Sequence, residues 1–230
     1  ALFIPHGAGP CFFMDWNPTD AWDKTAAYLR GIPASLPEKP KAILLVTAHW
    51  LAPQPSMSSA AQPGMLFDYY GFPPHTYELK YPAPGAPALA ERVSALLAGA
   101  GFAPQQDAAR GYDHGTFIPL KVAFPDADIP VLQLSLLQSL DAADHVRLGQ
   151  ALAPLRDEGV LIVGSGMSYH NMRGYGDPRS TAIAAEFDRW LTETVALPAA
   201  ERNARLADWA AASGPSGRLS HPPRAEEHLL

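Results

Sequence analysis

Ala42-Ile43-Leu44-Leu45-Val46-Thr47-Ala48 decides the fold class, because it is a short, almost entirely apolar run with no polar–apolar alternation. Such a run is typical of a β-strand that is buried on both faces of a sheet. Three further runs have the same character: Ala1–Ile4, Val131–Leu136 and Val160–Gly164. The sequence therefore predicts a central sheet whose two faces are both covered.

Helical patterns separate these runs. Asn17 is the expected N-cap of the first, and the predicted helices are Pro18–Gly31, Ala86–Ala100, Asp144–Asp157, Thr181–Leu197 and Ala199–Ala212. Strand–helix alternation predicts an α/β fold with a central, largely parallel or mixed sheet between helices. Pro53–Pro87 is rich in proline, glycine and aromatic residues, and we expect it to be a long functional loop. Residues 1–230 are expected to form a single catalytic domain.

Composition excludes several classes of protein. Hydrophobic residues make up 47% and charged residues 17%, which is typical of a globular protein, and no apolar run approaches the roughly 20 residues of a membrane span. A net charge of −6 argues against a nucleic-acid partner. The single cysteine, Cys11, excludes a disulfide framework and a thiolate-rich zinc site, and suits the cytoplasm. The oligomeric state stays open between monomer and dimer.

Histidines at strand ends are the main functional signal. His6 follows the first apolar run, His49 ends the second, and His170 follows Val160–Gly164 after a glycine-bearing turn. Ligands of α/β folds bind beyond the carboxyl ends of parallel strands, and imidazole is a common metal ligand. These positions favour a catalytic metal site, although each histidine alone is also compatible with a hydrogen-bonded core residue.

Other candidate residues have weaker contexts. His114 lies in a turn-rich segment before an apolar stretch, and His221 and His228 lie near the end of the chain. Gly164-Ser165-Gly166 resembles a nucleophile elbow only superficially, because the G-x-S-x-G order is absent. The sequence therefore argues against a serine hydrolase.

Taken together and in order, several motifs resemble those of class III extradiol ring-cleavage dioxygenases, and within them the branch of the 4,5-DOPA extradiol dioxygenases. The similar segments are Ile4–Gly7, Thr47–Trp50, Tyr81–Gly85, Tyr112–Thr116, Phe124–Val131, Gly164–Asn171 and Glu226–Leu230. The resemblance extends over essentially the whole chain. It implies an enzyme that inserts both atoms of O₂ into a catechol-type aromatic diol. Because the chain starts in a strand without Met and stops soon after His228, we expect native residues to be missing at both ends.

The resemblance also implies a set of site residues. A single divalent metal would be held by His6, His49 and His228, with His170 in or beside its coordination shell. Fe(II) is the metal expected for activity, and Zn(II) is a further ion that such a site binds. His170 is the candidate base for the catechol hydroxyl, and His114 is the candidate acid.

Two choices stay open from the sequence. The third metal ligand is His228, one of the glutamates Glu226 and Glu227, or His221, because all four lie close together. The alternative functions are a zinc-dependent hydrolase and a non-enzymatic metal-binding protein on the same scaffold.

Overall fold

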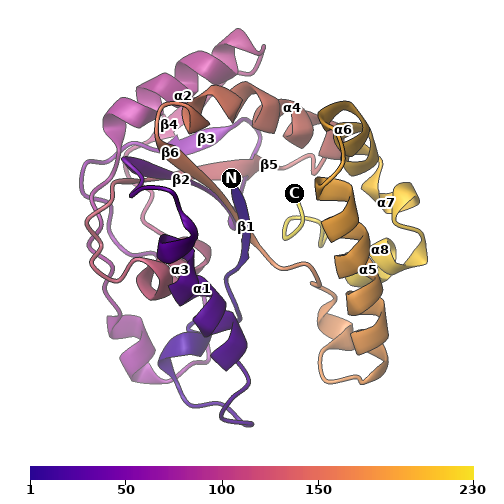
Figure 1. Cartoon of the computed structure of the whole chain (residues 1–230). Helices are drawn as coiled ribbons and strands as arrows, with labels where there is room; N and C mark the ends of the chain where they lie inside the picture. The colour runs from indigo at the N-terminus through magenta and orange to yellow at the C-terminus, as the bar shows by residue number, and fades with distance from the viewer.

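A six-stranded sheet forms the centre of the computed structural model, which describes residues 1–230 (Figure 1). Its strands are β1 (Leu2–Pro5), β2 (Ala42–Ala52), β3 (Ser56–Ser58), β4 (Gln105–Asp107), β5 (Val131–Leu137) and β6 (Val160–Gly166). They lie in the order β1-β6-β2-β5-β3-β4, and every neighbouring pair is parallel except β3 with β5. The predicted α/β class with a largely parallel, mixed sheet is confirmed.

Eight α-helices surround this sheet. They are α1 (Asp23–Ser35), α2 (Pro87–Gly99), α3 (His114–Ala123), α4 (Ala142–Leu152), α5 (Arg179–Val195), α6 (Ala199–Ala207), α7 (Trp209–Ala212) and α8 (Pro215–Ser220). In Figure 1, α1 and α3 lie on one side of the sheet and α2 and α4 on the other, while α5 to α8 gather beyond the β1 edge. None of these helices is long and apolar enough to cross a membrane.

The core is divided by the sheet into two layers. Ile43 and Leu45 of β2 belong to one apolar cluster with residues of α1 and α3, whereas Leu44 belongs to a second cluster with residues of α2 and α4. All three side chains are fully buried. Successive residues of a strand point to opposite faces, so a strand covered on both sides must be apolar throughout. This explains why the apolar runs lack alternation.

The first helix differs from the prediction. It begins at Asp23 rather than Pro18 and continues past Gly31 to Ser35, and its N-cap is Trp22, which makes no side-chain capping bond. Asn17 does not cap it. The ring of Trp22 packs against Phe12 at 5.9 Å and Trp16 at 5.7 Å between ring centroids. At the helix start, an aromatic residue packed on two other aromatic rings thus stands where the sequence favoured a polar cap.

The other differences have local causes. Pro53–Pro87 contains β3 and a 3₁₀ turn at Pro74–Glu78, so it is only partly irregular. The helix predicted at Asp144–Asp157 begins earlier, as α4 at Ala142, and after Leu152 it tightens into a 3₁₀ turn that contains Pro154, which lacks an N–H for the helical ladder. The predicted helix Ala199–Ala212 is divided at Asp208 into α6 and α7, and helices α3 and α8 were not predicted.

The C-terminal tail returns to the sheet at the carboxyl end of β6. The backbone N–H of Met167 donates to the carbonyl oxygen of His228 at 3.1 Å. A Cβ on Gly166 would overlap this oxygen and lie 2.9 Å from the carbonyl carbon of His228. Only glycine therefore allows the two backbones to approach so closely.

Gly166→Ala should destabilise the protein, because backbone atoms of the tail must move to admit the new methyl group. We expect a loss of about 1–3 kcal/mol in the free energy of unfolding, measured by urea denaturation. Gly149→Ala is the matched control: this glycine is exposed within α4 and a Cβ there meets nothing within 4 Å. It should leave stability unchanged or raise it by up to about 1 kcal/mol. Equal stability of the two variants would contradict this packing.

Candidate active site

Three histidines lie at the carboxyl edge of three adjacent strands. His6 follows β1 directly, His49 lies in the last part of β2, and His170 comes shortly after β6. Because β6 lies between β1 and β2 and all three strands are parallel, their carboxyl ends meet at one edge of the sheet. The structure thus brings the predicted strand-end histidines to the same region.

His49 does not end its strand, as the sequence had suggested. Strand β2 continues to Ala52, but its pairing with β5 shifts register between Val46 and Leu51. Such an irregularity changes the direction in which the side chains of this part of the strand point. The hydroxyl of Thr47 accepts a hydrogen bond from the backbone N–H of His49 at 3.1 Å and holds this bend.

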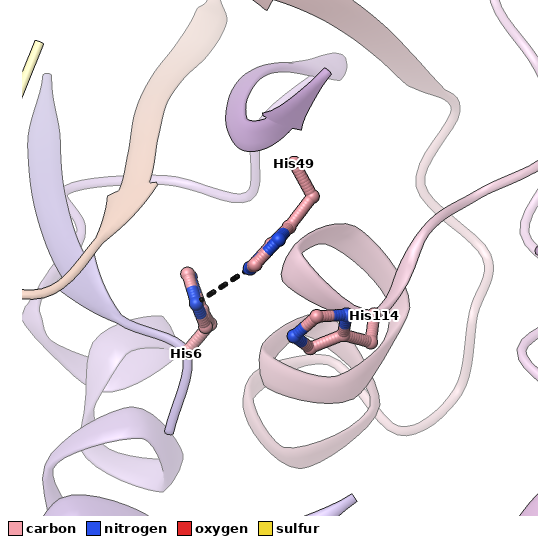
Figure 2. A group of neighbouring side chains, drawn as sticks. All are labelled: His6, His49 and His114. Carbon is pink, nitrogen blue, oxygen red and sulfur yellow. Dashed lines mark hydrogen bonds between the residues drawn. The ribbon is translucent and has the colours of Figure 1, made fainter. Parts of the chain in front are cut away.

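His114 joins His6 and His49 from the first turn of α3. Figure 2 shows the three rings directed toward a common point. The Nε2 atoms of His6 and His49 are 3.0 Å apart, and the ring centroids of His49 and His114 are 3.9 Å apart. One ligand atom from each residue lies within 4.8 Å of the others, so the three side chains form a group that could hold a metal ion.

His228 and His170 complete the cluster from the C-terminal side. The ring of His228 lies 5.0 Å from that of His6 and 5.1 Å from that of His49, between centroids. His170 stacks on His228 at 3.4 Å, and its Nδ1 lies 3.5 Å from the carboxylate of Glu227. These two histidines and Glu227 form a second possible metal-binding group. All five predicted site histidines therefore lie together, and we call them the histidine cluster.

The neighbouring ligand candidates of the tail are engaged elsewhere. His221 is fully buried, with Nε2 at 3.0 Å from the carbonyl oxygen of Ser168 and Nδ1 at 3.2 Å from that of Ala225. Glu226 accepts a hydrogen bond from Arg218 at 2.6 Å. The geometry therefore leaves His228 and Glu227 as the tail residues at the cluster, and adds His114 as a further neighbour of His6 and His49.

Burial keeps four imidazoles of the cluster uncharged, those of His6, His49, His170 and His228. Burial and the charges that neighbouring imidazoles would carry lower the pKa of His6 and of His228 well below the usual value. Burial also lowers the pKa of His49 to about 3 and that of His170 to about 4. A neutral imidazole has a free lone pair, which is the form that binds metal ions.

The start of α3 is fixed by Asp113. Its carboxylate accepts from the backbone N–H of Thr116 at 3.0 Å, as an N-cap does, and from the hydroxyl of Thr47 at 2.9 Å. Arg110 donates to the other carboxylate oxygen at 3.0 Å and to the carbonyl oxygen of His49 at 3.3 Å. The Asp at the N-cap was the sequence signal that could have revealed α3, and this network joins α3 to β2 beside the cluster.

Asp68 is a site residue that the sequence did not reveal, because it lies in an irregular loop. Its Oδ1 accepts from the backbone N–H of His114 at 2.9 Å and faces Nδ1 of the same residue at 2.8 Å. Burial alone would raise the pKa of Asp68, but the hydrogen bonds from His114 outweigh it and lower the pKa. The neighbouring Tyr69 packs its ring 5.8 Å from that of His114. Asp68 thus holds the ring of His114 by one nitrogen and leaves Nε2 to face the other imidazoles (Figure 2).

Comparison with known proteins assigns the family. Residues 1–210 match the family described as "Catalytic LigB subunit of aromatic ring-opening dioxygenase". The chain belongs to this family, the class III extradiol dioxygenases, as its motifs had suggested.

Individual relatives agree with this assignment. The chain is 42% identical over 210 residues to "Dioxygenase tasH" of Hapsidospora irregularis. The aligned region covers 84% of this chain but only 62% of that protein. It is 46% identical over 229 residues to "4,5-DOPA dioxygenase extradiol" of Beta vulgaris, covering 96% and 80% of the two chains. The protein of the same name from Escherichia coli K12 is 36% identical, with coverage of 100% and 81%.

A solved structure supports the fold. The crystal structure of an uncharacterised protein from Escherichia coli K12 matches with a TM-score of 0.69 and 33% identity, covering 89% of this chain and 77% of that one.

Asp68→Ala should lower turnover more than Asp68→Asn. The alanine variant loses both hydrogen bonds to His114, whereas asparagine keeps an acceptor oxygen and loses only the charge. We expect a loss of roughly 10- to 100-fold in kcat for alanine with metal content retained, because residues that orient active-site imidazoles have effects of this size. Asp128→Ala, which changes an exposed partner of Lys39, is the control. An Asp68→Ala variant with the kcat of the unmodified protein would contradict the role of Asp68.

Proposed function

We propose that the protein opens the ring of a catechol-type aromatic diol with O₂, next to the diol, at the histidine cluster. The observation that carries this proposal is the convergence of five imidazoles at the carboxyl edge of the sheet in a member of an aromatic ring-opening family. DOPA is the first substrate to test, since several relatives carry the name 4,5-DOPA dioxygenase.

The residues of the cluster fit a divalent metal. Its nitrogen donors are neutral imidazoles, and Nδ1 of His228 is buried without a hydrogen-bond partner. The one cysteine, Cys11, is buried and belongs to neither group of possible ligands. A site of imidazoles and a nearby carboxylate suits Fe(II) as the working metal and also accepts Zn(II).

His6, His49 and His228 are the proposed metal ligands. Their rings lie about equally far from one another, at 4.8, 5.0 and 5.1 Å between centroids, and they come from β1, β2 and the tail. A metal held by these three ligands would suit the chemistry of non-haem Fe(II) oxygenases, which use three protein ligands. Fe(II), when bound, supplies the redox chemistry that lets O₂ react with the electron-rich ring.

His170 and His114 are the proposed proton carriers. His170 stacks on His228 at the edge of the cluster and its imidazole is kept neutral by burial, so it can accept the proton of a catechol hydroxyl. His114 is held at Nδ1 by Asp68, so Nε2 is the nitrogen that can take up a proton and then deliver it to the oxygen that becomes part of the product. General acid–base catalysis of this kind contributes about 10²- to 10⁴-fold in rate.

Burial of the cluster supports the same chemistry. His6, His114 and His228 are at most 7% exposed, so little water reaches the ring nitrogens. Exclusion of water strengthens electrostatic interactions within the site and limits side reactions of O₂.

The function is tested by loading the metal-free protein with Fe(II) under anaerobic conditions and measuring O₂ uptake with DOPA and a panel of other catechols. We expect uptake with at least one catechol, and loss of uptake after chelation or after replacement by Zn(II). Hydrolytic activity of the Zn(II) protein, without O₂ uptake by the Fe(II) protein, would instead identify a zinc hydrolase. A metal-loaded protein that turns over no substrate would identify a metal-binding protein.

Metal content separates the ligands from the proton carriers. His228→Ala should lose bound metal, whereas His114→Ala should keep it and lose about 10²- to 10⁴-fold in turnover. Glu227→Gln, which removes the neighbouring carboxylate charge, should keep most of its metal. The measurement is metal stoichiometry after equilibration with limiting Fe(II). Loss of metal from His114→Ala or Glu227→Gln together with full retention by His228→Ala would contradict our choice of the third ligand.

A further inference from the structure

The segment Gly164-Ser165-Gly166, which did not fit a nucleophile elbow, lies directly beneath the histidine cluster. It forms the carboxyl end of β6, where Ser165 is paired with Ile4 of β1 on one side and Thr47 of β2 on the other. Ser165 is 3% exposed, and its hydroxyl oxygen lies 3.1 Å from Nδ1 of His6. Either the Ser165 hydroxyl or Nδ1 of His6 must donate in this hydrogen bond.

The Ser165 hydroxyl donates its only proton to another acceptor. The hydroxyl donates to the carbonyl oxygen of Gly115, in the first turn of α3. This carbonyl would normally accept from the N–H four residues later, but that residue is Pro119, which has no N–H. A buried carbonyl without a donor is costly, and the Ser165 hydroxyl replaces the missing helical donor.

This hydrogen bond determines which ring nitrogen of His6 carries the proton. A hydroxyl has a single proton, so toward His6 the Ser165 oxygen can only accept, and Nδ1 of His6 must donate. A neutral imidazole carries one ring proton, and a proton on Nδ1 leaves Nε2 with its lone pair free. Nε2 is the atom that faces the rest of the cluster, at 3.0 Å from Nε2 of His49 (Figure 2).

We propose that Ser165 is a positioning residue that fixes His6 as the Nδ1-protonated tautomer, so that an unprotonated Nε2 is presented to the metal. Pro119 makes this possible because it has no N–H to donate to the Gly115 carbonyl, so this carbonyl accepts the hydroxyl proton of Ser165 instead. The hydroxyl is therefore neither a nucleophile nor a ligand. The tautomer is a property of the metal-free protein. Only its expected effect on metal binding rests on the proposed metal site.

The tautomer is measured directly by NMR of the metal-free protein at pH 8, with ¹⁵N-labelled histidine. Protonated and unprotonated ring nitrogens of neutral imidazole have well-separated ¹⁵N shifts, and the signals of His6 are assigned by their loss in His6→Gln. We expect the proton of His6 on Nδ1. A proton on Nε2 would overturn the inference even if the protein binds metal tightly, and the proposed function would then stand without it.

Variants test the consequence for the metal. Zn(II) affinity, measured by competition with a chelator, should fall about 10- to 100-fold in Ser165→Ala, as found when groups that orient metal-binding histidines are removed. His6 should then show signals of both tautomers. Ser165→Thr keeps a hydroxyl and should retain the Nδ1 proton and most of the affinity.

Ser135→Ala is the matched control, since this serine is equally buried in β5 and accepts from the backbone N–H of Ser56 at 2.9 Å, away from His6. It should bind Zn(II) as the unmodified protein does. Unchanged affinity and an unchanged tautomer in a folded Ser165→Ala variant would overturn the inference. If that variant does not fold, the tautomer of the unmodified protein still decides it.

Discussion

Imidazole rings that are packed together inside a protein must be uncharged, because each charged ring would lose its hydration and repel the others. The histidine cluster meets this constraint by burial, which lowers the pKa of His6, His49, His170 and His228. A neutral ring still has one N–H that needs an acceptor. At His6 this acceptor is the Ser165 hydroxyl, and Nδ1 of His114 is likewise held by the Asp68 carboxylate. The rest of the site follows from how the fold supplies these partners.

The sheet order and helix α3 together supply them. Parallel strands β1, β6 and β2 bring His6, Ser165 and His49 to the same carboxyl edge of the sheet. Helix α3 then brings His114 to the same edge, and it is tied to β2 through the buried carboxylate of Asp113 and to β6 through the Ser165 hydroxyl. Because the buried carboxylate of Asp113 is paired with Arg110, loss of Arg110 would leave that carboxylate without its compensating charge.

The sequence predicted the parts of the site that depend on local pattern. Apolar runs locate strands, and their ends located His6 and His170 with little error. His49 was identified, but the register shift that changes the direction of its side chain was not, because register depends on the partner strand. His228 could be identified only by resemblance, since its place depends on the close approach of the tail to Gly166. Asp68 lies in a loop without periodicity, so only the folded chain shows that it binds His114.

We propose that the histidine cluster is the site at which O₂ reacts with an aromatic diol. The most direct measurement is mass spectrometry of the product formed by the Fe(II)-loaded protein under ¹⁸O₂, with the reaction quenched before the new aldehyde exchanges oxygen with water. We expect a ring-opened product that contains two ¹⁸O atoms, and no such product from the His6→Ala variant. A product with one labelled atom or none would contradict this proposal, because a ring-cleaving dioxygenase transfers both atoms of O₂ to its substrate.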